Sequence, residues 1–351
     1  MSRGTTTTPR PLRAFAALIT VGALALSACG SSGDTSSDTT ASGSATTTAA
    51  AADQPVGADC DAIDPTGSES DSGKWELKTS STPTMLTELE SALKNCEPIV
   101  VTLWHPHWAY AAYSLKDLKD PKGSMGKGEE IWATANKEWA SKNTELADAL
   151  KSFKMSDEQL ASLENFTQNK FKDDPAKGAE EWLKDPANKK LADGWVEGLD
   201  GDGESVTIGF IAWDEDIATT NLWKVLLEDA GYKVDTPELD AGPLFDGMAS
   251  GDIDFFFDTW LPTTHEDYWK RYGDKLVKLS QWYGGSATLN IAVPTYMNID
   301  SIDELAKWGS DLDHTIIGIE PGAGLTRITK CQMLPDYDLA AKPGASVCDA
   351  G

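Results

Sequence analysis

Short apolar runs alternate with stretches of helical period along the chain from about residue 75 onward, a pattern that predicts an α/β fold. Three of the runs read as buried strands, and each leads into a tryptophan. Ligands of open α/β folds bind beyond the carboxyl ends of strands, so we expect the three indoles to face one cavity. Core packing is the alternative for any one of them, and the position that they share argues against it. The runs with their tryptophans are 99–103 with Trp104, 206–211 with Trp213, and 253–257 with Trp260.

The intervening segments supply further strands and helices. Thr82 is expected as the N-cap of a helix that reaches about residue 95, because Pro83 suits the first helical position. Ser301 is expected to cap a second, short helix. Further strands are expected at 75–78, 131–134, 232–234, 288–293 and 315–319, with helices at 217–230, 243–249 and within 143–199.

A glycine-rich turn, Glu320-Pro-Gly-Ala-Gly-Leu-Thr326, joins the expected strand 315–319 to a helix. Such a turn lets backbone N–H groups approach an anion at the start of the helix. The turn lacks both the Gly-Lys-Ser/Thr ending of a phosphate loop and the Gly-x-Gly-x-x-Gly of a dinucleotide site. We therefore expect the amides of Gly324 and Leu325 to hold a small carboxylate, together with His265, which follows Trp260 by five residues.

Three indole faces and one anion site define the chemistry of a ligand. Indole faces attract cations that cannot form hydrogen bonds, quaternary ammonium groups above all. Each desolvated face contributes about 2 kcal/mol, so three approach the ~8 kcal/mol of micromolar binding. A zwitterion with a quaternary nitrogen and a carboxylate fits both halves. Asp214 and Glu215, which follow Trp213, are either solvated loop carboxylates or a source of negative potential near the cation.

The first residues indicate export. An apolar run at 14–26 follows three arginines and is much shorter than the ~20 residues that span a bilayer, so residues 1–28 are expected to be a signal peptide. Leu-Ser-Ala-Cys29 resembles a bacterial lipobox, which implies cleavage before Cys29 and diacylglycerol on its sulfur. The alternative is ordinary secretion with a chance cysteine. Residues 29–57 would then be a lipidated cysteine with a disordered linker.

The net charge limits the partners that we expect, and the cysteines limit the cofactors. The formal net charge of −26 argues against a nucleic-acid partner and against direct adsorption to anionic lipid. Four cysteines remain after Cys29, and an even number in an exported chain favours two disulfides, with three connectivities open. The absence of a Cys-x-x-Cys motif argues against a redox centre or a zinc knuckle, and we expect no cofactor and no metal.

Five longer motifs stand out along the chain: Val101-Thr-Leu-Trp-His-Pro-His-Trp108, Val206-Thr-Ile-Gly-Phe-Ile-Ala-Trp-Asp-Glu-Asp-Ile-Ala-Thr-Thr-Asn221, Leu239-Asp-Ala-Gly-Pro243, Trp260-Leu-Pro-Thr-Thr-His265 and Gly318-Ile-Glu-Pro-Gly-Ala-Gly324. They closely resemble the glycine betaine-binding proteins of osmoprotectant ABC transporters, over about residues 75–339. The resemblance implies the type II periplasmic-binding-protein fold, with two α/β lobes joined by a hinge and the ligand cleft between them. It also implies that Trp104, Trp213 and Trp260 cage the trimethylammonium group, while Gly324, Leu325 and His265 meet the carboxylate.

The order of these motifs differs from the simplest order in the family, which implies a circularly permuted chain. One lobe would be continuous over 131–292, and the other would be split between 75–130 and 293–351. Disulfides would hold the two pieces of the split lobe together at the chain ends that the permutation creates. We expect Cys60–Cys348 to tie the ends and Cys96–Cys331 to tie two helices.

The leading hypothesis is a monomeric, non-enzymatic lipoprotein on the extracytoplasmic face of the cell membrane. It would capture glycine betaine, proline betaine or a similar ligand and deliver it to an ABC permease. A choline- or carnitine-type binding protein is the nearest alternative. A metal-dependent enzyme built on His105-Pro-His107 is a weaker one, because the chain has only four histidines. A sensor domain that does not serve transport also stays open.

Overall fold

The computed structural model describes residues 54–67, 75–344 and 348. The expected signal peptide and the lipidation site at Cys29 lie outside these residues. Among the residues that are described, none of the helices combines the length and the apolar character needed to cross a membrane.

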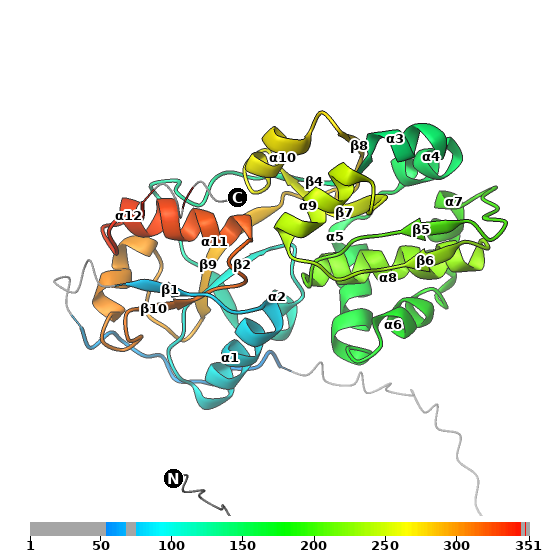
Figure 1. Cartoon of the computed structure of the whole chain (residues 1–351). Coiled ribbons are helices and arrows are strands. Elements are labelled where there is room, and N and C mark those ends of the chain that lie inside the picture. Colours follow the sequence, from blue (N-terminus) through cyan, green and yellow to red (C-terminus); the bar gives the residue numbers. More distant parts are fainter. Residues whose placement is uncertain (1–53, 68–74, 345–347, 349–351) are drawn as a thin grey trace, which may run out of the picture. The chain divides into compact units, whose positions relative to one another are not determined.

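A five-stranded sheet carries one half of the fold, in the order β1-β10-β2-β9-β3 (Figure 1). Strands β1, β10 and β2 run parallel to one another, whereas β9 runs antiparallel to both β2 and β3. We call the elements built on this sheet the first lobe. Its strands are β1 (Glu76–Lys78), β2 (Val101–His105), β3 (Leu115–Asp117), β9 (Thr288–Pro294) and β10 (Thr315–Ile317).

A second group of strands carries the other half, which we call the second lobe. Strand β4 pairs antiparallel with both β7 and β8, and β5 pairs parallel with β6. A parallel bridge between Ile208 and Phe255 joins the two sets. These strands are β4 (Glu130–Asn136), β5 (Ser205–Thr207), β6 (Lys233–Asp235), β7 (Phe255–Leu261) and β8 (Leu276–Gln281).

Helices connect the strands of both lobes. The first lobe contains α1 (Thr82–Asn95), α2 (Ala109–Ala112), the 3₁₀ helix η3 (Ile302–Trp308), α11 (Gly324–Ile328), the π-helical turn η4 (Thr329–Met333) and α12 (Leu334–Asp336). The second lobe contains α3 (Lys137–Lys142), α4 (Thr144–Ser152), α5 (Asp157–Glu164), the π-helical turn η2 (Asn165–Lys170), α6 (Pro175–Trp182), α7 (Pro186–Trp195), α8 (Asp214–Asp229), α9 (Ala241–Ser250) and α10 (Glu266–Tyr272).

Helix boundaries follow the capping residues closely. Ser301 is the N-cap of η3 as expected, with a capping box to Glu304. Helix α1 is capped by Ser81, one residue before the predicted Thr82, because the Ser81 side chain accepts a hydrogen bond from the backbone N–H of Thr84. Helix α8 begins three residues earlier than predicted, at Asp214, so that three acidic residues fill its first turn. Acidic side chains are favourable there because of the helix dipole.

Two of the three strands extend past their tryptophans, which corrects the expectation that each indole follows its strand. Trp104 lies inside β2, since the next residue, His105, still pairs with Thr288 of β9. Trp260 lies inside β7, since Leu261 still pairs with Glu130 of β4. A neighbouring strand thus fixes the backbone on both sides of these two indoles.

The chain passes between the lobes on either side of the second lobe. One passage precedes β4 and the other lies between β8 and β9, and the two meet at an antiparallel bridge between Glu129 and Ala287. The Ala287 N–H donates to the Glu129 carbonyl, and the Glu129 N–H donates to the Ala287 carbonyl. The expected lobe boundary at 292/293 falls inside β9, whose residues pair with β2 and β3, so this strand belongs to the first lobe.

The disulfide pairing differs from the one that we expected at the ends of a permuted chain. Cys60 bonds to Cys96, and Cys331 bonds to Cys348. The predicted pairs, Cys60–Cys348 and Cys96–Cys331, are therefore wrong. Each bond is local: the first ties the segment before β1 to the C-cap of α1, and the second ties the end of the chain to η4. The split lobe is closed by its sheet, in which β1 pairs with β10.

Aromatic side chains fill the core of the second lobe. Phe153 stacks against Trp282 and makes edge contacts with Trp195, Trp223 and Phe257. Trp223 and Trp282 are fully buried. This core supports the strand β7 that carries Trp260.

Candidate functional site

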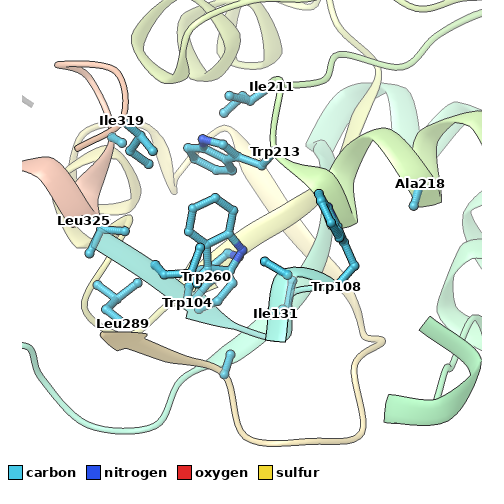
Figure 2. Packing of buried hydrophobic residues seen from close by; sticks show 14 of the residues in the cluster. Trp104, Trp108, Ile131, Ile211, Trp213, Ala218, Trp260, Leu289, Ile319 and Leu325 are labelled. Carbon is cyan, nitrogen blue, oxygen red and sulfur yellow. The ribbon is translucent and has the colours of Figure 1, made fainter. Parts of the chain in front are cut away.

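The three tryptophans that follow or end the predicted strands line one cavity, as shown in Figure 2. The empty space at the cavity, including the solvent at its open side, is about 280 Å³. Trp104 comes from β2 in the first lobe, whereas Trp213 and Trp260 come from the second lobe. The lining residues are Trp104, Trp213, Glu215, Trp260, Thr264, Leu289, Ile319, Ala323, Gly324 and Leu325.

Each of the three indoles donates its N–H to a carboxylate. A buried indole N–H needs a partner, and a carboxylate at the ring edge satisfies it while the ring face stays available to the cavity. All three tryptophans are at most 5 % exposed. The bonds join Trp104 Nε1 to Glu215 Oε2 at 2.9 Å, Trp213 Nε1 to Glu320 Oε1 at 2.5 Å, and Trp260 Nε1 to Asp258 Oδ1 at 2.8 Å.

One acidic side chain, Glu215, lines the cavity, and Asp258 accepts the N–H of Trp260 beside it. Burial raises the pKa of Glu215 well above its usual value, and the charges of Asp258 and Glu164 raise it further. Burial also raises the pKa of Asp258, to about 7. Of the two residues whose role the sequence left open, Glu215 is therefore not a solvated carboxylate but part of the cavity wall. A cation in the cavity would favour the ionised form of these groups.

The glycine turn reaches the same cavity from the first lobe. Gly324 and Leu325 line it and form the first positions of α11. The first N–H groups of a helix have no acceptor within the helix, so the amides at these positions can serve a ligand carboxylate. The structure thus brings the three indoles and these two residues together at one cavity.

His265 lies beside Trp213 and Trp260, although it is not among the described residues that line the cavity. Its ring stacks on Trp213, with centroids 5.5 Å apart and planes 10° apart. Its Nδ1 accepts the Trp260 backbone N–H at 2.9 Å. Burial, aided by the charge of Arg327, lowers the pKa of His265 to about 3, so the ring is neutral. The proton of a neutral ring must then be on Nε2, which is buried and has no partner among the described residues.

The two histidines of His105-Pro-His107 have separate partners. His105 Nε2 lies 2.8 Å from Asp117 Oδ2 in the first lobe, and its ring stacks on Tyr110. His107 Nδ1 accepts the Ala109 N–H, and its Nε2 lies 3.1 Å from Asp214 Oδ2. Across the described ranges, no group of three or more histidine, cysteine, aspartate or glutamate side chains is arranged to hold a metal ion.

Sequence reasoning missed several residues of the site. Leu289 and Ile319 complete the apolar wall, and Thr264 lies where the loop after β7 meets the glycine turn. Glu320 was seen only as part of the turn and not as the acceptor of the Trp213 N–H. A strand-end position was the available signal for Ile319, which follows β10, whereas nothing local in the sequence pairs Glu320 with a tryptophan 107 residues away.

Comparison with known proteins agrees with this geometry. The sequence profile of the substrate-binding domain of the ABC-type glycine betaine transport system matches residues 49–185 and 204–346. The chain is also 33 % identical over 237 residues to the glycine betaine/carnitine transport binding protein GbuC of Listeria monocytogenes serotype 1/2a (strain 10403S). That alignment covers 67 % of this chain and 77 % of the relative.

The profile match extends over most of the chain and includes every described residue that lines the cavity. The family has the type II periplasmic-binding-protein fold, and the two α/β lobes described above agree with it. Its members are extracytoplasmic proteins that bind a small molecule for an ABC permease, and they are not enzymes, which removes the metal-dependent alternative. The chain belongs to the family of substrate-binding domains of ABC-type glycine betaine transport systems.

Proposed function

We propose that this protein captures glycine betaine, or a close relative with a quaternary nitrogen and a carboxylate, and delivers it to an ABC permease for osmoprotection. The observation that carries the proposal is the cavity in which Trp104, Trp213 and Trp260 meet. A trimethylammonium group cannot donate a hydrogen bond, so its binding free energy must come from ring faces and negative potential. The indoles of the cavity offer the ring faces, and Glu215 in its wall would supply the negative potential once a bound cation favours its ionised form.

The carboxylate of the ligand would lie at the start of α11. Gly324 and Leu325 line the cavity as the first residues of α11, where backbone N–H groups have no acceptor within the helix and would be available to a carboxylate. His265 is the second donor in the proposal, because its Nε2–H is buried without a partner among the described residues. A small rotation of this ring or the arrival of the ligand would bring the donor into use, with a neutral imidazole throughout.

Delivery depends on closure of the two lobes around the ligand. The bridge between Glu129 and Ala287 is where the two passages meet, and we assign the hinge to it. In our proposal the closed form is what the permease recognises. The protein acts as a monomer, held at the extracytoplasmic face of the membrane by a lipid on Cys29.

The order of the motifs supports a circularly permuted chain as part of this proposal. The segment with Trp104 precedes the second lobe, and the glycine turn follows it. Strands β1 and β10 come from opposite ends of the folded region and pair in parallel, a pairing that would close the first lobe across the ends of a permuted chain. Joining these ends and opening the chain before β5 should give a protein that still folds and binds the same ligand.

Carnitine and choline are the nearest other ligands. The name of the Listeria relative includes carnitine, and carnitine has the same two charged groups as glycine betaine. Choline lacks the carboxylate and would leave Gly324, Leu325 and His265 without a partner. We therefore expect the order of affinity to place glycine betaine and carnitine above choline.

Tryptophan fluorescence of the soluble fragment from Ala51 tests the proposal. Glycine betaine should give a saturable change, whereas L-proline, which has no quaternary nitrogen, should give none. A response to choline alone would retain the cage and remove the carboxylate site. A folded fragment that responds to none of these compounds would refute the proposed function. Transport and sensing are then separated by deleting the gene and measuring betaine uptake at high osmolarity.

A further inference from the structure

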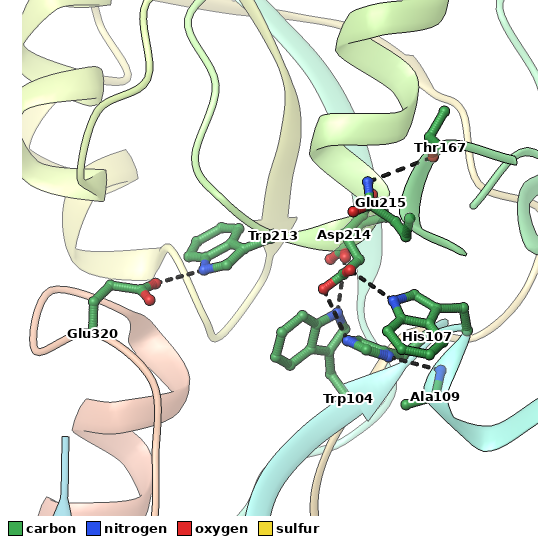
Figure 3. A network of polar contacts seen from close by, with 10 residues as sticks. Trp104, His107, Ala109, Thr167, Trp213, Asp214, Glu215 and Glu320 are labelled. Carbon is green, nitrogen blue, oxygen red and sulfur yellow. Dashed lines mark hydrogen bonds and ion pairs between the residues drawn. The ribbon is translucent and has the colours of Figure 1, made fainter. Parts of the chain in front are cut away.

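Two of the three cage indoles donate their N–H groups to a carboxylate of the opposite lobe, and we call these two hydrogen bonds the exchanged bonds. Figure 3 shows one of them, from Trp213 to Glu320. Trp104 belongs to the first lobe and donates to Glu215 of the second lobe. Trp213 belongs to the second lobe and donates to Glu320, which follows β10 in the first lobe. The third indole, Trp260, donates to Asp258 on its own strand β7. The two exchanged bonds therefore exist only while the lobes are together.

The first turn of α8 collects further contacts of the same kind. Asp214 accepts the N–H of Trp108 at 2.6 Å, and it lies 3.1 Å from His107 Nε2. Trp108 and His107 belong to the first lobe, and Asp214 belongs to the second. Trp213 and Glu215 flank Asp214 in sequence, so three consecutive residues contact the first lobe. Anionic side chains are stabilised at this end of a helix, which suits them to accept hydrogen bonds there.

In this geometry, closure of the two lobes also completes the arrangement of the three indoles. An indole that has lost its N–H acceptor has lost one of the restraints on its side-chain torsions, and the direction of its face is then less fixed. The exchanged bonds fix Trp104 and Trp213 when the lobes meet, whereas Trp260 is held in either state by Asp258. Trp213 keeps its stack on His265 of the same lobe, so closure adds the N–H bond that completes its alignment, and it adds the corresponding bond to Trp104.

We propose that Glu320 and Glu215 are positioning residues that couple lobe closure to completion of the indole cage. The inference rests on the proposed function and adds to it the residues that decide how long a captured ligand stays. Glu320 is the better residue to mutate in a test of this coupling, because it is not among the described residues that line the cavity. It acts on the ligand through Trp213, whereas Glu215 also forms part of the cavity wall.

The test compares ligand dissociation in variants of the soluble fragment by stopped-flow fluorescence. Glu320→Leu removes the acceptor, and Glu320→Gln keeps an oxygen that can accept. Hydrogen bonds to charged groups contribute enough for an increase of about 10- to 100-fold in the dissociation rate of glycine betaine with leucine, and for a smaller one with glutamine. Glu228→Gln removes a carboxylate at the far end of α8, where it pairs with Lys224, and should leave the rate unchanged.

A double-mutant cycle separates positioning from a purely structural role. Trp213→Phe keeps an aromatic face and removes the indole N–H. If Glu320 acts through that N–H, adding Glu320→Leu to Trp213→Phe changes the dissociation rate by less than about threefold. An equal loss in both backgrounds, or an unchanged rate in Glu320→Leu alone, would overturn the inference. Thermal unfolding checks that each variant is folded. If Glu320→Leu does not fold, the dissociation rate of Glu320→Gln decides between the two outcomes.

Small-angle scattering of the ligand-free fragment gives a second readout. Loss of the exchanged bonds should shift the unliganded fragment toward the open form in Glu320→Leu and not in Glu228→Gln. Identical scattering of the wild-type and Glu320→Leu fragments, with and without glycine betaine, would also overturn the coupling. If the wild-type fragment itself binds no betaine, the proposed function fails instead, and the two failures are thereby distinguished.

Discussion

A side chain at Gly324 would collide with the backbone of Thr264: an added Cβ would lie 2.2 Å from the Thr264 carbonyl oxygen. Gly324 begins α11 in the first lobe, and Thr264 lies in the loop after β7 in the second lobe. Both residues line the cavity. The absence of a side chain at position 324 therefore allows the lobes to approach each other where we place the ligand carboxylate.

Gly324→Ala is expected to weaken glycine betaine binding by about tenfold or more, because overpacking of this kind costs about 1–3 kcal/mol. The steric conflict exists only between the lobes, so the free energy of unfolding of the ligand-free fragment should change little. Isothermal titration calorimetry measures the first quantity and urea unfolding the second.

Gly322→Ala is the matched control for this change. It lies in the same turn, and its added Cβ would meet only the Tyr268 hydroxyl, at 4.0 Å. Its affinity should stay near that of the wild type. Equal losses in both alanine variants would show that the flexibility of the turn, and not the approach to Thr264, governs binding.

Replacing any one of Trp104, Trp213 or Trp260 by alanine is expected to weaken glycine betaine binding by about 30-fold, the equivalent of one desolvated indole face. Calorimetry with the soluble fragment measures the change. Trp139→Phe is the control, because Trp139 packs on Phe255 and is not among the described residues that line the cavity. Retention of full affinity in two of the three cage variants would contradict a three-sided cage.

Asp258 should make the ligand-free fragment less stable as the pH rises. Burial raises the pKa of this carboxyl from 3.8 to about 7 in the folded protein. Between these values the folded state keeps a proton that the unfolded state has lost, so its stabilising contribution is present below the lower pKa and is lost as the pH rises through the upper one. Asp258→Asn has no such contribution to lose.

Urea unfolding of the wild type and Asp258→Asn at about pH 5 and about pH 8 measures this effect. The stability of the asparagine variant relative to the wild type should increase from the lower to the higher pH. Asparagine keeps an oxygen that can accept the Trp260 N–H, so the comparison isolates the ionisation. A constant difference across this range would mean that Asp258 titrates in the folded protein as it does in the unfolded chain.

Removing either disulfide is expected to lower stability without changing the ligand site. The bonds close loops with sequence separations of 36 and 17 residues. Chain-entropy arguments give a loss of about 3–4 kcal/mol for loops of these lengths. Paired serine substitutions with urea unfolding measure it, and calorimetry should find the affinity for glycine betaine unchanged. Peptide mapping without reduction should find Cys60 joined to Cys96, and a Cys60–Cys348 peptide would contradict the structure.

The parts of the site that the sequence predicted are those encoded locally. Trp104 and Trp260 could be found because each sits at the end of an apolar run, and Gly324 and Leu325 because a glycine-rich turn precedes a helix. The exact strand ends could not be found, since pairing with β9 and β4 extends β2 and β7 past their indoles.

The missing parts depend on contacts between distant segments. Glu320 accepts from Trp213 only because the lobes meet, and Cys60 reaches Cys96 because the segment before β1 packs beside α1. The same holds for β9, whose place in the first lobe is set by pairing with β2 and not by its own sequence. Patterns along a chain predict strands and turns, and they do not determine which distant partners these elements meet.

A crystal structure of the soluble fragment with glycine betaine would test the central claim most directly. We expect the trimethylammonium group between the faces of Trp104, Trp213 and Trp260, with the carboxylate at the amides of Gly324 and Leu325 and within reach of His265 Nε2. The Trp104–Glu215 and Trp213–Glu320 bonds should both be present. A ligand bound elsewhere, or a cavity that stays empty in a saturated crystal while betaine binds in solution, would contradict the account.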